Sequence, residues 1–175
     1  MSHPFFSRFY FATVFMLSLL IPLAGCGGGS SSSPGTDAVE TTAANKDLPN
    51  QIDALPVEPL TLKEEESLLF MREEEKLARD VYLYLYGIWG EQIFLNISDS
   101  EQQHTDAVLA LIEKYDLPDP AADKAEGEFV NPDLLGLYDL LTAQGEASLI
   151  DALIVGAQIE ELDINDLKDS MATVQ

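Results

Sequence analysis

From Leu60 onward, apolar residues recur at alternating steps of three and four, which is the spacing of one face of an α-helix. The clearest case runs from Phe94 through Val108 to Tyr115. No run of alternating β-branched residues with hairpin turns interrupts the pattern. The sequence therefore predicts an all-α fold. Four helices with a long connection between the second and the third favour a four-helix bundle with a shortened third helix.

Capping residues and helix breakers set the limits of these four helices. Gly87 and Gly90 punctuate the chain after the first helix. Residues 98–101 also fit a capping box, which would make the second helix begin at Ser98. The helices expected are 61–86, 91–115, 132–145 and 148–167, with Thr61, Asn131 and Ser148 as caps.

The chain has 175 residues, and its 9 Lys and Arg against 31 Asp and Glu give a formal net charge of −22. Such a charge strongly disfavours binding to a phosphate backbone, so nucleic acid is not an expected partner. An apolar fraction of 46% is sufficient for the core of one domain. Cys26 is the only cysteine, which excludes an internal disulfide and a Cys-x-x-Cys pair.

Residues 1–25 have the anatomy of a secretory signal peptide, with a basic residue, an apolar stretch and a small-residue ending before Cys26. That ending is similar to a bacterial lipobox, in which the signal is cut before the cysteine and the thiol carries a diacylglycerol. The alternative is an uncleaved transmembrane anchor, because the apolar stretch is nearly long enough to span a bilayer. The lipoprotein interpretation predicts lipidation of Cys26 and a place in the cell envelope on a bacterial membrane, which is the outer membrane in a Gram-negative host.

Residues 26–59 are expected to be the lipidated cysteine and a flexible, low-complexity tether rich in Gly, Ser, Thr, Asp and Pro. The folded helical domain is then expected over residues 60–175. A membrane reached through the lipid anchor is the expected partner. The sequence leaves a homodimer and the identity of any electron donor open.

Acidic residues and one histidine fall on the helix faces that are expected to point inward. Burial of an ionised carboxylate costs several kcal/mol, so such positions need a cation, hydrogen bonds or a metal ion. The inward residues are Glu74, Glu101, His104, Glu160 and Asp163.

Glu74 lies in the middle of the apolar face expected for the first helix. The basic residues Arg72, Lys76 and Arg79 point about 100° or more away from it on a helical wheel. They are therefore poorly placed to neutralise its charge, apart from a partial approach by their long stems. The apolar face comprises Phe70, Met71, Leu77, Ala78, Val81, Leu85 and Ile88.

A bound metal ion explains the inward set economically, and Glu101 and His104, three residues apart, can reach one ion from one helix. Simpler explanations stay open. Glu101 also fits the capping box, and a core histidine held by hydrogen bonds is the alternative for His104. Glu73, Glu75 and Glu161 are expected to be solvated neighbours of the set.

Taken together, these residues resemble the ferritin-like superfamily, especially its rubrerythrin-like members. Within it the chain is most similar to an uncharacterised bacterial and archaeal ferritin-like family of unknown function. The resemblance covers about residues 60–167. The shared segments are residues 73–82, residues 100–104, Asn131-Pro132 with Leu137-Tyr138, and Gly156-Ala157 with residues 159–164.

The resemblance implies a di-iron or di-manganese carboxylate site, built in the superfamily from a Glu on the first and third helices and Glu-x-x-His on the second and fourth. Glu74, Glu101, His104 and Glu160 match this pattern. Asp163 stands where the second histidine is expected, and the third helix has no Glu on its apolar face. The implied cofactor is one or two ions of Fe or Mn, because one imidazole among carboxylates is a hard ligand set.

The function implied is that of a membrane-anchored metal-binding domain that could act as a redox enzyme, a non-haem di-metal oxidoreductase, on O₂ or peroxide. The alternative is a ferritin-like interaction or metal-binding module without catalytic turnover. The sequence contains no rubredoxin-like Cys₄ module that could supply electrons from within the chain. Since fold analogy does not establish activity, the sequence names no catalytic residue.

Overall fold

The computed structural model describes residues 48–173 of the chain. The chain divides into two compact units, residues 1–56 and residues 57–175. All regular secondary structure of the described residues is helical, which confirms the all-α prediction. The expected signal peptide over residues 1–25 and the expected lipidation site Cys26 lie outside the described residues.

The first unit contains one described helix, α3 (Leu48–Ala54). It lies within the stretch expected to be a flexible tether. Just after its last turn, the Leu55 N–H donates to the Ile52 carbonyl over 3.1 Å. This part of the stretch is therefore helical, and the tether stays a prediction for the residues before it.

The second unit contains four helices, of which α6 is the shortest with 14 residues. The sequence sets where they begin. Thr61 and Glu64 form a complete capping box ahead of the first of them, and Asn131 accepts a hydrogen bond from the Asp133 N–H ahead of the third. The four helices are α4 (Leu62–Trp89), α5 (Gln92–Lys114), α6 (Pro132–Gly145) and α7 (Leu149–Thr173).

The boundary between α4 and α5 differs from the prediction by a few residues. Gly87 remains helical, and α4 ends at Gly90, whose φ of +67° is a left-handed conformation that glycine adopts without steric cost. The capping box expected at Ser98 does not form, because the Ser98 hydroxyl is buried and donates to the Leu95 carbonyl. The longer of the two alternatives for the second helix is therefore confirmed.

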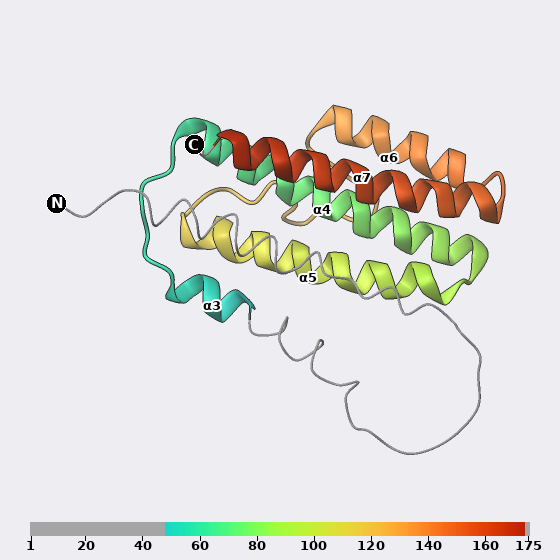
Figure 1. Cartoon of the computed structure of the whole chain (residues 1–175), viewed down its shortest axis with the longest axis horizontal. Helices are drawn as coiled ribbons and strands as arrows, with labels where there is room; N and C mark the ends of the chain where they lie inside the picture. The colour runs from blue at the N-terminus through green and yellow to red at the C-terminus, as the bar shows by residue number, and fades with distance from the viewer. Residues whose placement is uncertain (1–47, 174–175) are drawn as a thin grey trace, which may run out of the picture. The chain divides into compact units, whose positions relative to one another are not determined.

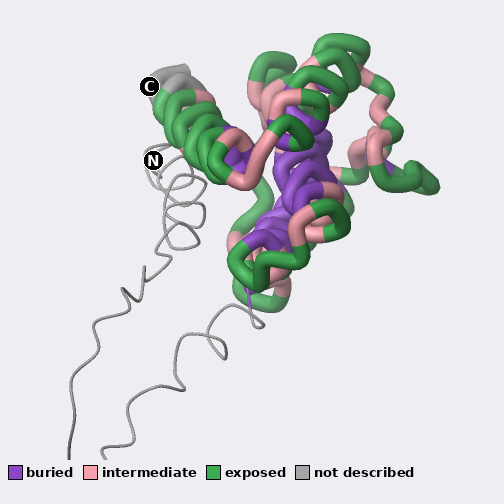
Figure 2. The backbone as a smooth tube through the Cα atoms, turned by 90° about the vertical axis from the view of Figure 1, so that its right-hand side faces the viewer, coloured by how far each residue is buried: buried purple, intermediate pink, exposed green. Residues whose placement is uncertain are grey.

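The helices pair in two layers (Figure 1). Helices α4 and α5 lie side by side and antiparallel, α6 and α7 form a second antiparallel pair, and both members of that pair pack against α4. Figure 2 shows the buried residues on the inner sides of the helices and the exposed ones on the outer sides. The apolar core comprises Leu77, Ala78, Val81, Tyr82, Leu85, Phe94, Leu134, Leu141, Ala152, Val155 and Ile159.

Helix α4 is buried on more sides than the predicted apolar face covers, because α5, α6 and α7 all pack against it. Phe70 and Ile88, both predicted to lie on that face, are 38% and 49% exposed, respectively. A buried series follows the helix at steps of three and four: Leu68, Met71, Glu75, Ala78, Tyr82 and Leu85. This series passes through Glu75 and not through Glu74, which is only half-buried.

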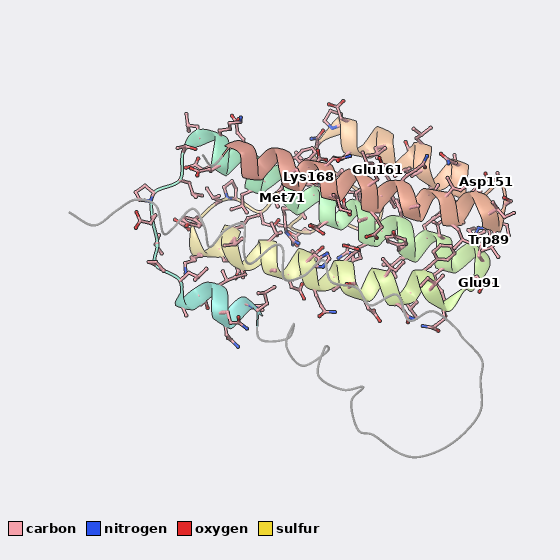
Figure 3. The ribbon with its side chains drawn as sticks, in the orientation of Figure 1. Met71, Trp89, Glu91, Asp151, Glu161 and Lys168 are labelled. Carbon is pink, nitrogen blue, oxygen red and sulfur yellow. The ribbon has the colours of Figure 1, made fainter. Side chains whose placement is uncertain are left out.

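At one end of the second unit, the last residue of α4 is hydrogen-bonded to the last residue of α6. The Trp89 indole N–H donates to the Gly145 carbonyl over 2.9 Å. Figure 3 shows Trp89 at this end, together with Asp151 of the first turn of α7. None of the described helices is both long and apolar enough to cross a membrane. The helix order is compatible with a four-helix bundle, and the ferritin-like arrangement stays a prediction.

Candidate metal centre

Three ligand side chains from two helices meet in the core. Glu75 comes from α4, and Glu101 and His104 come from consecutive turns of α5. One ligand atom of each lies within 4.8 Å of the others, and no residue of the three is more than 5% exposed. His104 Nδ1 lies 2.8 Å from Glu101 Oε2 and 3.4 Å from Glu75 Oε2. These three residues form a compact buried site, which we call the triad.

The helix geometry explains why the triad forms. Glu101 and His104 project to the same side of α5 because they are three residues apart. At 1.5 Å per residue, Glu75 and His104 lie about 22 and 21 Å along their helices from Gly90. Since α4 and α5 are antiparallel neighbours, the two residues lie at one level.

The electrostatics of the triad depend on its single imidazole. Burial raises the pKa of the Glu75 carboxyl, although the His104 imidazole 3.4 Å away opposes this. Burial lowers the pKa of His104, but the hydrogen bond with Glu101 and the negative charges of Glu101 and Glu75 raise it well above its ordinary value. The Glu75 Oε2 atom is buried and has no hydrogen-bond partner among the described residues. A protonated imidazole is therefore the cation that balances the carboxylates of the triad.

Two carboxylates of α7, Glu160 and Asp163, add to the negative charge near the triad. Burial and the charges of Glu75, Glu101 and Glu160 raise the pKa of Asp163. Burial also raises the pKa of Glu160, and the hydrogen bond from Tyr82 lowers it. Both residues, which the sequence predicted as ligands, interact electrostatically with the triad, but neither is one of its three members.

Glu74, the ligand predicted on the first helix, lies outside the triad. It is half-buried, and burial followed by a hydrogen bond with Asp166 of α7 raises its pKa to about 10. The charges of Asp163 and Glu75 raise it further. The structure therefore brings Glu75 together with Glu101 and His104 and leaves Glu74 facing α7.

The expectation that Glu73 and Glu75 are solvated is wrong, since they are only 4% and 5% exposed. Glu73 accepts hydrogen bonds from the backbone N–H groups of Val130 and Asn131, so it holds the start of α6. Backbone donors compensate its burial, and Glu75 has no such donors. Glu161 is exposed on α7, as expected (Figure 3).

The basic residues of α4 are paired with other carboxylates. Arg72 binds Asp119 through two nitrogens, at 2.9 and 3.0 Å. Lys76 and Arg79 both pair with the fully buried Asp80, and Lys76 also donates to the Ala125 carbonyl over 2.7 Å. These three cations are therefore paired with other carboxylates and do not neutralise the triad.

The residues present fit a divalent transition metal ion. An orphaned, buried carboxylate oxygen is costly, and a cation next to Glu75 Oε2 would remove that cost. Carboxylate oxygens suit Mn²⁺ and Fe²⁺, and imidazole nitrogen suits iron and other transition metals. Mg²⁺ and Ca²⁺ prefer ligand sets made only of oxygen, which His104 does not offer.

Fold and site together define an all-helical domain with a buried carboxylate–histidine triad between two long antiparallel helices. Comparison with known proteins shows the family to which this domain belongs. The chain belongs to the family described as an uncharacterized protein domain, DUF2202, which matches residues 64–175. The triad and both candidate carboxylates of α7 lie within the matched residues.

One archaeal relative is similar in sequence and in structure. The chain is 55% identical over 117 residues to the uncharacterized protein MJ0754 of Methanocaldococcus jannaschii, and the match covers 67% of this chain and 63% of the relative. The crystal structure of the hypothetical protein MJ0754 from Methanococcus jannaschii DSM 2661 matches with a TM-score of 0.66 and 54% identity, covering 67% of each chain. The chain thus shares its fold with part of that relative and spans less than two thirds of the curated protein's length.

Proposed function

We propose that this domain binds a divalent transition metal ion, iron or manganese, through Glu75, Glu101 and His104. Glu160 and Asp163 of α7 complete the ligand set. The observation that carries the proposal is the buried triad, whose ligand atoms lie within 4.8 Å of one another and whose Glu75 Oε2 has no hydrogen-bond partner among the described residues.

The competing explanation is a structural cluster in which the His104 imidazolium is the permanent counter-ion of the two glutamates. In that case a metal ion would compete with a proton and gain little. The proposal predicts the reverse, because a divalent ion balances two carboxylates and releases the proton held by His104. The two explanations therefore differ in whether metal stabilises the fold.

Thermal unfolding of the purified protein with and without Mn²⁺, or Fe²⁺ under anaerobic conditions, distinguishes them. An ion that binds only the native state stabilises it by about 2.7 kcal/mol at a hundredfold excess over Kd. Mg²⁺ at the same concentration is the matched control and should shift the transition far less. The absence of a shift with every transition metal, together with no metal in the protein as isolated, would overturn the proposal.

We extend the proposal to redox activity on O₂ or peroxide, as the resemblance to rubrerythrin-like proteins suggests. A bound iron or manganese ion would supply one-electron redox chemistry, and the protein would bind the ion and keep bulk water from it. Two ferrous ions reduce one hydrogen peroxide, with two protons, to two waters. Stopped-flow absorbance of the ferrous-loaded protein mixed with peroxide tests this. A folded, loaded protein that stays ferrous for minutes would favour a binding module without turnover.

We further propose that Cys26 carries a lipid anchor. This proposal rests on the signal-peptide anatomy of residues 1–25 and on their lipobox-like ending. Two or more acyl chains hold a protein stably on a membrane, at about 0.8 kcal/mol per buried CH₂. Detergent partitioning and a fatty-acid label on the wild type and on Cys26→Ser provide the test. An unlabelled wild type with unchanged partitioning in the variant would overturn the anchor.

A further inference from the structure

Tyr82 of α4 connects the core to the carboxylates of α7. It is fully buried, one heptad after Glu75 on the same face of the helix. Its hydroxyl lies 2.8 Å from Glu160 Oε1 and 3.0 Å from the Gly156 carbonyl. The only side-chain partner of this hydroxyl among the described residues is therefore a candidate metal ligand.

Gly156 provides the space that this contact needs. A Cβ atom at Gly156 would lie 3.3 Å from Tyr82 Cε1, closer than most Cβ atoms approach a neighbour, and 3.5 Å from the tyrosine hydroxyl oxygen, at ordinary van der Waals contact. Tyr82 therefore packs against bare backbone of α7, one turn before Glu160. The tyrosine ring and the glycine together fix both the height and the direction from which the hydroxyl meets the carboxylate.

We infer that Tyr82 is a positioning residue for the metal centre: its hydroxyl holds Glu160 by Oε1, so that this carboxylate presents its other oxygen to the ion bound at the triad. The inference rests on the proposed function and adds a residue that is not itself a ligand. A hydroxyl that donates to a ligating carboxylate fixes its orientation and limits it to one coordinating oxygen.

The charge state of Tyr82 is consistent with this role. Burial, followed by the charge and the hydrogen bond of Glu160, raises the pKa of the Tyr82 phenol. The phenol is therefore a neutral O–H donor at any physiological pH, and its hydrogen bond to the carboxylate persists whether or not a metal ion is bound.

The test is a titration of the full-length protein with Co²⁺, whose visible absorption reports both occupancy and coordination number. Tyr82→Phe removes only the hydroxyl, and we expect Co²⁺ affinity to fall about 10-fold to 100-fold, with a changed absorption intensity as Glu160 reorients. Tyr84→Phe is the matched control, because it removes the same group from the same helix where it contacts Glu146. The control should bind as the wild type does.

A double-mutant cycle with Glu160→Gln shows whether Tyr82 acts through Glu160. In the Glu160→Gln background, we expect Tyr82→Phe to change Co²⁺ affinity by less than twofold. An equal loss in both backgrounds would overturn the inference, as would a Tyr82→Phe variant with wild-type affinity and spectrum. A wild type that binds no Co²⁺ overturns the proposed function itself, which is a different result. Urea unfolding without metal verifies that each variant is folded.

Discussion

Two groups of buried charges lie on α4 within two turns of each other, and they are balanced differently. Asp80 is fully buried and is paired with Lys76 and Arg79, and it also accepts the Gly127 N–H over 3.0 Å. Glu75 is also buried, but its nearest partners are a second carboxylate and one imidazole. We call the first group the paired cluster and keep the name triad for the second.

The difference shows which buried charges serve the fold and which are open to a ligand. In the paired cluster each carboxylate oxygen of Asp80 already has protein donors, so a metal ion has nothing to add there. In the triad, Glu75 Oε2 has no hydrogen-bond donor among the described residues, and the raised pKa of the Glu75 carboxyl shows that the His104 imidazole compensates its charge only in part. Total buried charge alone would not distinguish these two sites.

The largest effect is expected in the paired cluster. Asp80→Asn keeps the shape of the side chain but leaves the buried Lys76 and the half-buried Arg79 without their carboxylate. Breaking a buried ion pair on one side costs about 3–5 kcal/mol, so urea unfolding should show a loss of this size with and without metal. A loss of unfolding free energy below 1 kcal/mol, or a loss that added Mn²⁺ reverses, would contradict the conclusion that the paired cluster serves the fold and does not bind metal.

The next effect is specific to the triad. His104→Gln removes the imidazole while keeping a hydrogen-bonding side chain, and it should abolish the stabilisation by metal, about 2.7 kcal/mol at a hundredfold excess over the wild-type Kd. Differential scanning calorimetry with and without Mn²⁺ measures it. If His104→Gln retained the full metal-induced shift, the imidazole would not be a ligand.

A smaller effect concerns pH and Glu74. The pKa of Glu74 rises from 4.5 to about 10 on folding, so between these pH values the native state holds a proton that the unfolded state has lost. Metal-free stability should therefore fall as pH rises through this window. Glu74→Gln has no proton to lose, and at pH 8 it should be more stable than the wild type by about 1–3 kcal/mol.

Urea unfolding of both proteins at pH 5 and pH 8 provides the measurement. The advantage of Glu74→Gln should shrink toward pH 5, where about a quarter of the unfolded chains also carry the proton, given an unfolded pKa of 4.5. A constant difference at both pH values would show that the substitution acts through packing and not through ionisation.

The helices were predictable from the sequence because their signals are local. Apolar spacing, the caps Thr61 and Asn131 and the breaker Gly90 each act within one turn, so the four helices begin within one residue of their expected starts. The end of the fourth helix was predicted less well, because α7 runs to Thr173 and not to residue 167. Helix α3 was missed because it lies in a stretch without clear hydrophobic periodicity. Its composition favoured a tether more strongly than its seven residues favoured a helix.

The candidate site was only partly predictable, because choosing between neighbouring glutamates requires the tertiary register. Glu101 and His104 share one helix face and were found by their spacing. On α4 the predicted apolar face was broad enough to contain Glu74, and only the series through Leu68, Ala78 and Tyr82 selects Glu75. The spacing of that series is present in the sequence. Including Phe70 and Ile88, which are exposed, in the predicted apolar face shifted that face toward Glu74.

The smallest effect is expected at Glu161, and Glu161→Gln serves as the control for the loss of a negative charge on α7. It is exposed on α7 immediately after Glu160, so its carboxylate is solvated. Glu161→Gln removes one negative charge from the same helical turn as Glu160→Gln. Because a surface substitution of this kind usually changes stability by less than 0.5 kcal/mol in either direction, metal-free unfolding and Mn²⁺ affinity should both match the wild type. If Glu161→Gln weakened Mn²⁺ binding as much as Glu160→Gln does, we would conclude that the overall negative charge of α7, and not a specific ligand, attracts the ion. The contrast between an open triad and a paired cluster would then no longer explain the binding.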